Sequence, residues 1–223
     1  HYQGGRYEFA MAKAPIETTF DMADFPQVSA GIVKWPMSVI RLQSADKKAI
    51  VDASERILAS WQTYSVPELE IVAFSPDGTP HHTVTPIARR RGELFEIDLV
   101  LRDNNVSAEH PDGIFHPHQE VQHIKKENIG LIEVMGLAVF PPRLEKELVE
   151  VEKYLINEAN EIADYHLPWA ENMKAAHRVT AENVQAIVQQ EVGLIFKQVL
   201  EHAGVFKRDE KGQAAFNAFV TQI

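Results

Sequence analysis

The sequence of 223 residues contains no cysteine, which excludes disulfide bonds, thiolate metal ligands and a catalytic thiolate. It also lacks any run of 18 or more apolar residues, so no segment is expected to span a membrane. No secretory signal peptide is recognisable. Because disulfides form and persist in oxidising compartments, these absences together predict a cytoplasmic protein without membrane contacts.

Basic residues are scarce, since 22 Lys and Arg stand against 32 Asp and Glu and the formal net charge is −10. A general nucleic-acid binder needs a cationic face to neutralise phosphates, so this balance argues against nucleic-acid partners. Local clusters can still override the global sign. Two such clusters, Arg89-Arg90-Arg91 and Lys125-Lys126, leave room for a small phosphorylated substrate.

The hydrophobic pattern changes near residue 140. Before it, β-branched and aromatic residues between turn signals predict strands over 6–11, 17–22, 28–42, 69–74, 82–88 and 94–102, and an apolar run predicts a buried strand over 129–140. A helix is expected over 45–64, with Ser44 as its N-cap. After Pro141-Pro142, apolar residues recur at helical spacing to Ile162 and again over 180–202, and a short helix ends near Gln222. The pattern predicts an α+β protein with a mixed domain over 1–140 and a helical extension over 141–223.

Two segments carry the spacing of a phosphate-handling His-x-His-x-Gln motif in part. In a strand, a histidine nucleophile and an amide two residues later point to one side, where the amide can hold phosphoryl oxygens. In His116-Pro117-His118-Gln119-Glu120 that second position is Glu120, whose charge would repel a phosphate.

At the start of the chain, His1-Tyr2-Gln3 keeps the required spacing. Gly4 and Gly5 follow it and permit close approach of the backbone to a phosphate. The alternative is that His1 is a tag remnant or an ordinary mobile terminus. We therefore take His1 and Gln3 as the better catalytic candidates, and His116 and His118 as supporting ones.

Three stretches of the sequence resemble the bacterial second class of the galactose-1-phosphate uridylyltransferase family. They are Gln3-Gly4-Gly5-Arg6-Tyr7, Gly113-Ile114-Phe115-His116-Pro117-His118, and residues 123–138, and they occur in the order of the family. The resemblance covers essentially the whole chain. Because the family is normally about twice this length, we expect a carboxyl-terminal portion that lacks its amino-terminal half.

The resemblance implies a histidine-triad-like antiparallel sheet with packed helices and ping-pong uridylyl transfer. His1 would attack the α-phosphorus of UDP-glucose to form a uridylyl-histidine, and galactose 1-phosphate would then accept the uridylyl group. Gln3 would be the amide donor to the phosphoryl oxygens. No cofactor is required for this chemistry, and the isolated chain is expected to be weakly active or inactive.

Further site residues follow from the same resemblance. Lys125 or Lys126 would pair with the sugar phosphate, and Glu133 with sugar hydroxyls. The first class of the family holds a structural metal, zinc or iron, for which Glu17 and His82 stand at suitable positions. However, the strand that should supply a His-x-His pair reads Ile97-Asp98-Leu99-Val100, and this departure argues against a metal there.

Two alternatives to the transferase remain open from the sequence. The chain could be a non-catalytic module that binds sugar phosphate or supports dimerisation, because its carboxyl-terminal helices could serve a homodimer. It could also belong to a related nucleotidyltransferase that uses another nucleotide sugar.

Overall fold

The computed structural model describes residues 3–223, so His1 and Tyr2 lie outside the described part of the chain. The chain divides into two compact units. The first comprises residues up to 116, together with 130–137 and 200–223, and the second comprises 117–129 and 138–199. Each unit has its own apolar core and is described by itself.

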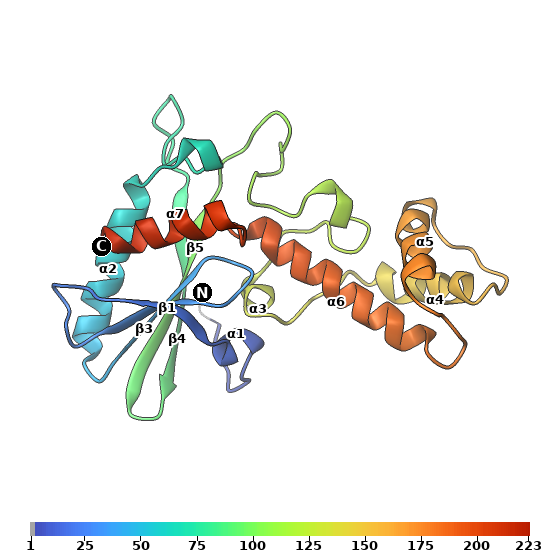
Figure 1. The fold of residues 1–223 in the computed structure, drawn as a ribbon, viewed down its shortest axis with the longest axis horizontal. Coiled ribbons are helices and arrows are strands. Elements are labelled where there is room, and N and C mark those ends of the chain that lie inside the picture. The colour runs from blue at the N-terminus through green and yellow to red at the C-terminus, as the bar shows by residue number, and fades with distance from the viewer. Residues whose placement is uncertain (1–2) are drawn as a thin grey trace. The chain divides into compact units, whose positions relative to one another are not determined.

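The first unit is built on a five-stranded antiparallel sheet with the order β1-β2-β3-β5-β4 (Figure 1). Its strands are β1 (Ile16–Phe20), β2 (Ser29–Val33), β3 (Val39–Ser44), β4 (His82–Arg91) and β5 (Leu94–Asp103). The β4–β5 hairpin pairs from His82↔Asp103 to Arg91↔Leu94, and Gly92 turns it with a φ of 59°. Such a left-handed residue suits glycine, which has no Cβ to clash.

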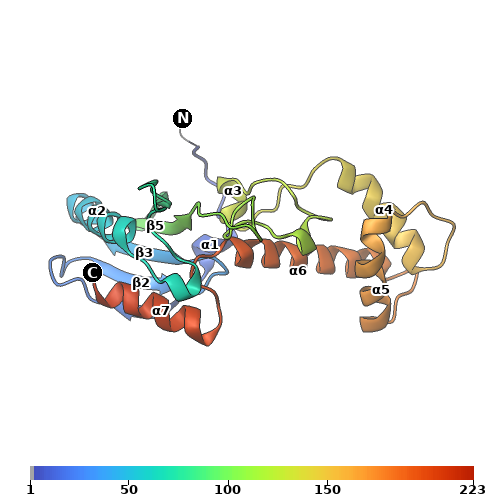
Figure 2. The same cartoon turned by 90° about the horizontal axis from the view of Figure 1, so that it is seen from above.

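Alternation along the strands gives the sheet one apolar and one charged face. Ile40 and Leu42 of β3 and Leu99 of β5 point into the core, whereas Arg41 and its partner Asp98 point to the other side. The apolar face is covered by α2 (Lys47–Thr63) and α7 (Glu210–Thr221), whose aromatic side chains meet in the core. Figure 2 shows both helices beside the strands.

Short elements complete the first unit. They are α1 (Ala10–Lys13), the 3-10 helix η1 (Pro67–Leu69) and α3 (Leu131–Val134). Trp61 of α2 is fully buried, and its indole nitrogen donates to the carbonyls of Thr83 and Arg102 at 3.0 and 3.1 Å. These two hydrogen bonds fix α2 to the end of the β4–β5 hairpin, because a buried donor without a partner would be costly.

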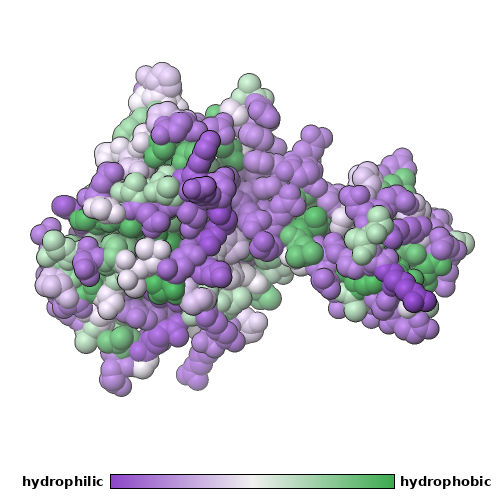
Figure 3. Space-filling model, viewed as in Figure 1, coloured by the Kyte–Doolittle hydropathy of each residue, from purple (hydrophilic) through white to green (hydrophobic). Residues whose placement is uncertain are grey.

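The second unit is helical. It contains the 3-10 helix η2 (Gln119–Val121), α4 (Arg143–Leu155), the 3-10 helix η3 (Asp164–His166), α5 (Leu167–Ala176) and most of α6 (Val184–Ala203). Its core joins apolar residues of α4, α5 and α6, and Val151, Ala170 and Val188 are among the most buried of them. On the face seen in Figure 3 both units carry mostly hydrophilic residues between apolar patches. Within residues 3–223 no helix combines the length and apolarity needed to cross a membrane.

The expected α+β class, with an antiparallel sheet and packed helices, is confirmed. The domain boundary predicted near residue 140 is not where the compact units divide. Residues 200–223 belong with the sheet, because Phe206, Phe216 and Phe219 pack in its core. The cap of α2 is Asp46, whose carboxylate accepts from the backbone N–H groups of Lys48 and Ala49 at 2.8 and 3.2 Å, and Ser44 instead ends β3.

The buried strand predicted over 129–140 is wrong. This segment contains the single helical turn α3 and no strand. Glu133 caps the turn by accepting a hydrogen bond from the backbone N–H of Gly130 at 2.8 Å. An apolar run with no clear period does not distinguish a buried strand from a buried helical turn. Likewise, residues 6–11 form no strand, and 69–74 contribute only isolated bridges.

Candidate active site

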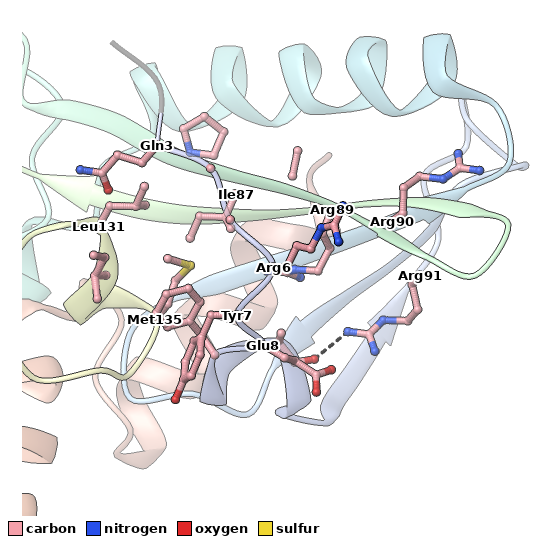
Figure 4. A pocket seen from close by; sticks show the side chains of 17 residues that line it. Gln3, Arg6, Tyr7, Glu8, Ile87, Arg89, Arg90, Arg91, Leu131 and Met135 are labelled. Carbon is pink, nitrogen blue, oxygen red and sulfur yellow. Dashed lines mark hydrogen bonds between the residues drawn. The ribbon is translucent and has the colours of Figure 1, made fainter.

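An open groove of about 1280 Å³ lies on the charged side of the sheet, within the first unit (Figure 4). The amino-terminal segment from Gln3 to Phe9 forms one wall, and β4 from Pro86 to Arg91 forms another. Leu131, Ile132 and Met135, in and just after α3, supply an apolar end. The groove therefore combines polar and apolar surfaces beside Gln3.

The floor beneath the groove is a network of three arginines and two carboxylates. Asp98 accepts from Arg41 at 2.7 and 2.9 Å and from Arg89 at 2.8 Å. Glu96 accepts from Arg89 at 2.6 Å and from Arg91 at 2.7 and 2.9 Å. Both carboxylates are buried, and the three guanidinium groups leave the network with one net positive charge.

The strand register explains this network. Arg41 stands opposite Asp98 between β3 and β5, and Arg89 stands opposite Glu96 between β4 and β5, so all four side chains share one face. Burial alone would raise the pKa of Glu96, but hydrogen bonds from Arg91, Arg89 and Gln43 lower it to about 2. The carboxylate is therefore ionised at neutral pH.

The same arginines hold the amino-terminal segment against the sheet. Arg41 donates to the carbonyls of Met11 and Ala14 at 2.9 and 3.0 Å, and Arg91 donates to the carbonyl of Ala12 at 2.7 Å. These three carbonyls lie directly after the groove-lining residues Gln3 to Phe9. The network thus fixes residues 11–14, at the carboxyl-terminal end of the segment that carries Gln3.

The apolar end of the groove is held by hydrogen bonds to two of its backbone carbonyls. The Trp35 indole donates to the carbonyl of Val134 at 3.0 Å, and the backbone N–H of Met11 donates to the carbonyl of Met135 at 3.1 Å. Gly136 has a φ of 96°, and a Cβ there would lie 2.8 Å from the Trp35 ring. Only glycine fits this position without displacing Trp35.

The exposed groups of the groove suit a phosphorylated ligand. Gln3 offers an amide, and Arg6 offers an exposed guanidinium on the same segment (Figure 4). Gly4 and Gly5 have open space where a side chain would begin, so a ligand can approach the backbone. Guanidinium groups pair with phosphate through two parallel hydrogen bonds. The apolar end would suit a ring or a sugar face.

Of the predicted catalytic pair, Gln3 lines this groove, whereas His1 lies outside the described residues. The predicted substrate residues fall in different places. Glu133 belongs to the first unit and is buried as the cap of α3. Lys125 and Lys126 belong to the second unit, where Lys125 is buried and donates to the carbonyl of Val139 at 3.2 Å, while Lys126 is exposed.

The supporting histidines also divide between the units. His116 ends the first unit's long loop, and its Cβ lies 3.0 Å from the position a Cβ would take on Gly113. His118 belongs to the second unit and is the N-cap residue of η2. Their roles toward a substrate stay predictions.

The two residues considered for a metal do not converge. Glu17 lies on β1 and His82 on β4, at opposite edges of the sheet, so four strand spacings or about 19 Å separate their strands. Both ring nitrogens of His82 have partners, the Trp61 carbonyl at 2.8 Å and Asp103 at 3.0 Å. Glu17 pairs with Arg208. These two residues therefore cannot hold one ion together in this fold.

The charged floor is the part of the site that sequence reasoning missed. The alternating pairs Glu96-x-Asp98 and Arg89-x-Arg91 flank a hairpin turn, and their register could have predicted facing charges on one side. Arg6 stands inside a stretch used for the family resemblance but was given no role. Charged residues at every second position of both strands were the sequence signal for this charged face.

A groove with an amide, guanidinium groups and accessible glycine backbone defines a candidate site for a phosphorylated ligand. Residues 1–171 match the family model described as galactose-1-phosphate uridyl transferase, C-terminal domain. The chain belongs to this family.

Curated relatives named galactose-1-phosphate uridylyltransferase match along the whole chain. Those of Latilactobacillus sakei (strain 23K), Enterococcus faecalis (strain ATCC 700802 / V583) and Streptococcus mutans serotype c are 61%, 59% and 60% identical to it. Each alignment covers 100% of this chain but only 45% of the relative. The chain thus spans less than half the length of these proteins. No solved structure matches it.

Proposed function

We propose that this chain is the carboxyl-terminal portion of an enzyme that transfers a uridylyl group between UDP-glucose and galactose 1-phosphate. Family membership is the observation that carries the proposal. The names of the relatives support the reaction, and the 45% coverage supports a missing amino-terminal half. His1 is the nucleophile in this proposal, and galactose 1-phosphate accepts the uridylyl group from its imidazole.

The uridylyl group is transferred in two steps, first to His1 and then to galactose 1-phosphate. A neutral imidazole nitrogen of His1 forms a bond to the α-phosphorus, and the bond from that phosphorus to the bridging oxygen of glucose 1-phosphate breaks. The phosphate oxygen of galactose 1-phosphate then attacks the same phosphorus and releases the imidazole. The Gln3 amide donates to a non-bridging oxygen during both steps, where negative charge gathers.

In the groove, Arg6 would pair with the phosphates, and Leu131, Ile132 and Met135 would contact a ring or the sugar. The arginine–carboxylate floor acts indirectly, since it holds residues 11–14 and hence the segment that bears Gln3 and Arg6. Lys125 or Lys126 and Glu133 remain proposed contacts for the sugar phosphate.

The proposal is tested in the complete protein, with the amino-terminal half restored. UDP-glucose labelled in the uridylyl group should leave acid-labile label on the wild type, and His1→Ala should abolish both label and turnover. Gln3→Ala should lower kcat by about 100- to 1000-fold, as loss of one oxyanion donor does elsewhere. Gln222→Ala, an exposed glutamine at the far end of the chain, is the matched control.

Arg6→Gln should raise the KM for UDP-glucose by about 10- to 100-fold, the range expected for one lost charge-assisted hydrogen bond. Arg56→Gln, an exposed arginine on α2, should leave the KM unchanged. Label that persists in His1→Ala would contradict the assigned nucleophile.

The isolated chain should show little or no turnover, because we propose that part of the nucleotide pocket belongs to the missing half. Robust turnover by residues 1–223 alone would contradict this. Calorimetric titration separates the remaining alternatives. Binding of galactose 1-phosphate without UDP-glucose by the complete protein would favour a non-catalytic module, and preference for another nucleotide sugar would favour a related nucleotidyltransferase.

A further inference from the structure

The helical unit contains a cluster of three nitrogen-bearing rings that the proposed reaction does not use. His123 follows η2, His166 ends η3 and Trp169 lies in the first turn of α5. The ring centroids are 5.6 Å apart for His123 and His166, 5.4 Å for His123 and Trp169, and 5.9 Å for His166 and Trp169. Each ring is therefore a neighbour of the other two, and all three belong to the second unit.

Each ring has one buried nitrogen without a partner. Among the residues that the structure describes, none forms a hydrogen bond with His123 Nε2, His166 Nδ1 or Trp169 Nε1. His166 is fully buried and Trp169 is 8% exposed. An unpaired buried polar atom costs about 1–3 kcal/mol, so three of them on neighbouring rings require an explanation.

The opposite nitrogens of the two imidazoles determine which atoms are donors. His166 Nε2 lies 3.0 Å from the Glu147 carboxylate on α4, so this nitrogen carries the proton. His123 donates to the backbone carbonyl of Glu120, and since its Nε2 is unpaired the donor is Nδ1. His123 Nε2 and His166 Nδ1 are therefore lone-pair acceptors, whereas Trp169 Nε1–H can only donate.

Two acceptors and one donor match the hydrogen-bonding capacity of one water molecule, which can donate two hydrogen bonds and accept one through a lone pair. Buried waters commonly make about three hydrogen bonds to otherwise unpaired groups. A metal ion fits less well, because an indole N–H is not a ligand and structural sites use about four protein ligands. The Arg143 guanidinium, which donates to Glu147 and to the carbonyl of His123, adds a further positive charge nearby.

We propose that His123, His166 and Trp169 enclose one water molecule, which donates to both imidazoles and accepts from the indole, and that folding of the helical unit requires both histidines to be neutral. Protonation of either imidazole places a second donor against the water and removes an acceptor. The cluster then acts as a pH-sensitive element that joins η2, α4, η3 and α5.

The charged surroundings favour the neutral rings. Burial lowers the pKa of both histidines below the ordinary 6.5, and the mutual repulsion of the two rings and the charge of Arg143 act in the same direction on His123. Glu147 opposes this at His166 but is shared with Arg143 and Tyr165. Because the unfolded chain binds these protons and the folded unit does not, stability is full above about pH 6.5 and falls as the pH drops below it.

Nuclear magnetic resonance of the full chain, labelled with ¹⁵N, tests the water directly at pH 7.5. The expected result is the Nδ1–H tautomer for His123, the Nε2–H tautomer for His166, and a rotating-frame cross-peak from the Trp169 indole proton to a long-lived water. A direct indole–imidazole hydrogen bond without that cross-peak would overturn the proposal. So would stoichiometric Zn²⁺ that shifts both unpaired ring nitrogens.

The pH dependence is measured by exchange of the amides in α4 and α5, corrected for intrinsic rates. The equilibrium constant for opening of these helices should rise as the pH drops below 6.5. The rise should be up to about 100-fold per pH unit if opening binds two protons, and about 10-fold per pH unit in His123→Gln. His177→Gln, a partly exposed histidine of the same unit paired with Glu191, should keep the wild-type dependence. A flat profile in the wild type would overturn the proposal even if His123→Gln fails to fold.

Discussion

Replacing Glu96 by Gln isolates the electrostatic contribution of the buried floor, because the amide keeps the size and loses the charge. In the wild type the Glu96 carboxylate accepts from Arg89, Arg91 and Gln43. Its side chain is fully buried, so solvent cannot replace these partners in the folded state. The variant leaves the arginines facing a neutral group and is expected to fold with reduced stability.

The magnitude follows from the pKa. These hydrogen bonds lower the pKa of Glu96 from 4.5 to about 2 against the opposing effect of burial. At about 1.4 kcal/mol per unit, this difference makes the charged form contribute about 3 kcal/mol to the free energy of unfolding at pH 7. A loss of that size is consistent with breaking a buried ion pair from one side.

The sign of the pH dependence distinguishes this cause from a packing defect. A carboxylate with a lowered pKa stabilises the fold above the unfolded value of 4.5, and that contribution disappears as the pH falls toward 2. The difference between wild type and Glu96→Gln should therefore be constant from pH 7 to about 5. It should shrink by about 1.4 kcal/mol per pH unit below 4.5.

Urea unfolding at several pH values measures this difference. Glu93→Gln is the matched control, since Glu93 is exposed beside the β4–β5 turn and its replacement should change stability by less than about 0.5 kcal/mol. A difference below about 1 kcal/mol for Glu96→Gln at pH 7, or one that stays constant at pH 3.5, would refute the reasoning.

Two further substitutions, one of them with a matched control, test how the groove and the sheet edge are held. Gly136→Ala should lower the free energy of unfolding by about 1–3 kcal/mol in urea, because a Cβ would meet the Trp35 ring at 2.8 Å with φ at 96°. Gly193→Ala, in the exposed middle of α6 with nothing within 4 Å, should instead raise it by up to about 1 kcal/mol, and equal effects would contradict this contrast. Arg208→Ala should cost no more than about 1 kcal/mol by the same assay, because its pair with Glu17 lies at the surface, and a larger loss would show a role that the ion pair does not explain.

Local patterns in the sequence predicted most of the first unit. The helix α2 was expected because its apolar residues recur at helical spacing, and the strands β4 and β5 because β-branched and aromatic residues lie between turn signals. Where one strand was expected over 28–42, the structure has two, β2 and β3, with Pro36 between them. Each of these features depends on residues close together in the chain.

Features that depend on distant residues could not be predicted in this way. The segment 129–140 has the composition of a strand, but Trp35 and Met11 bind its backbone in a single helical turn. Helix α5 was missed because Pro168 and a short length obscured its period, although Pro suits a first helical turn. The place of α7 in the sheet's core depends on contacts across most of the chain.

The groove shows why a family resemblance and residue patterns supplied different parts of the site. The resemblance selected Gln3, because a motif records which residues touch a substrate. It assigned no role to Arg41, Glu96 or Asp98, which touch the backbone of residues 11–14 or one another. Yet a segment can present Gln3 to a phosphorus only if it is held in place, and three arginine–carbonyl contacts hold its carboxyl-terminal end at residues 11–14. The buried carboxylates therefore support the candidate site through the arginines that they orient, and neither carboxylate lines the groove.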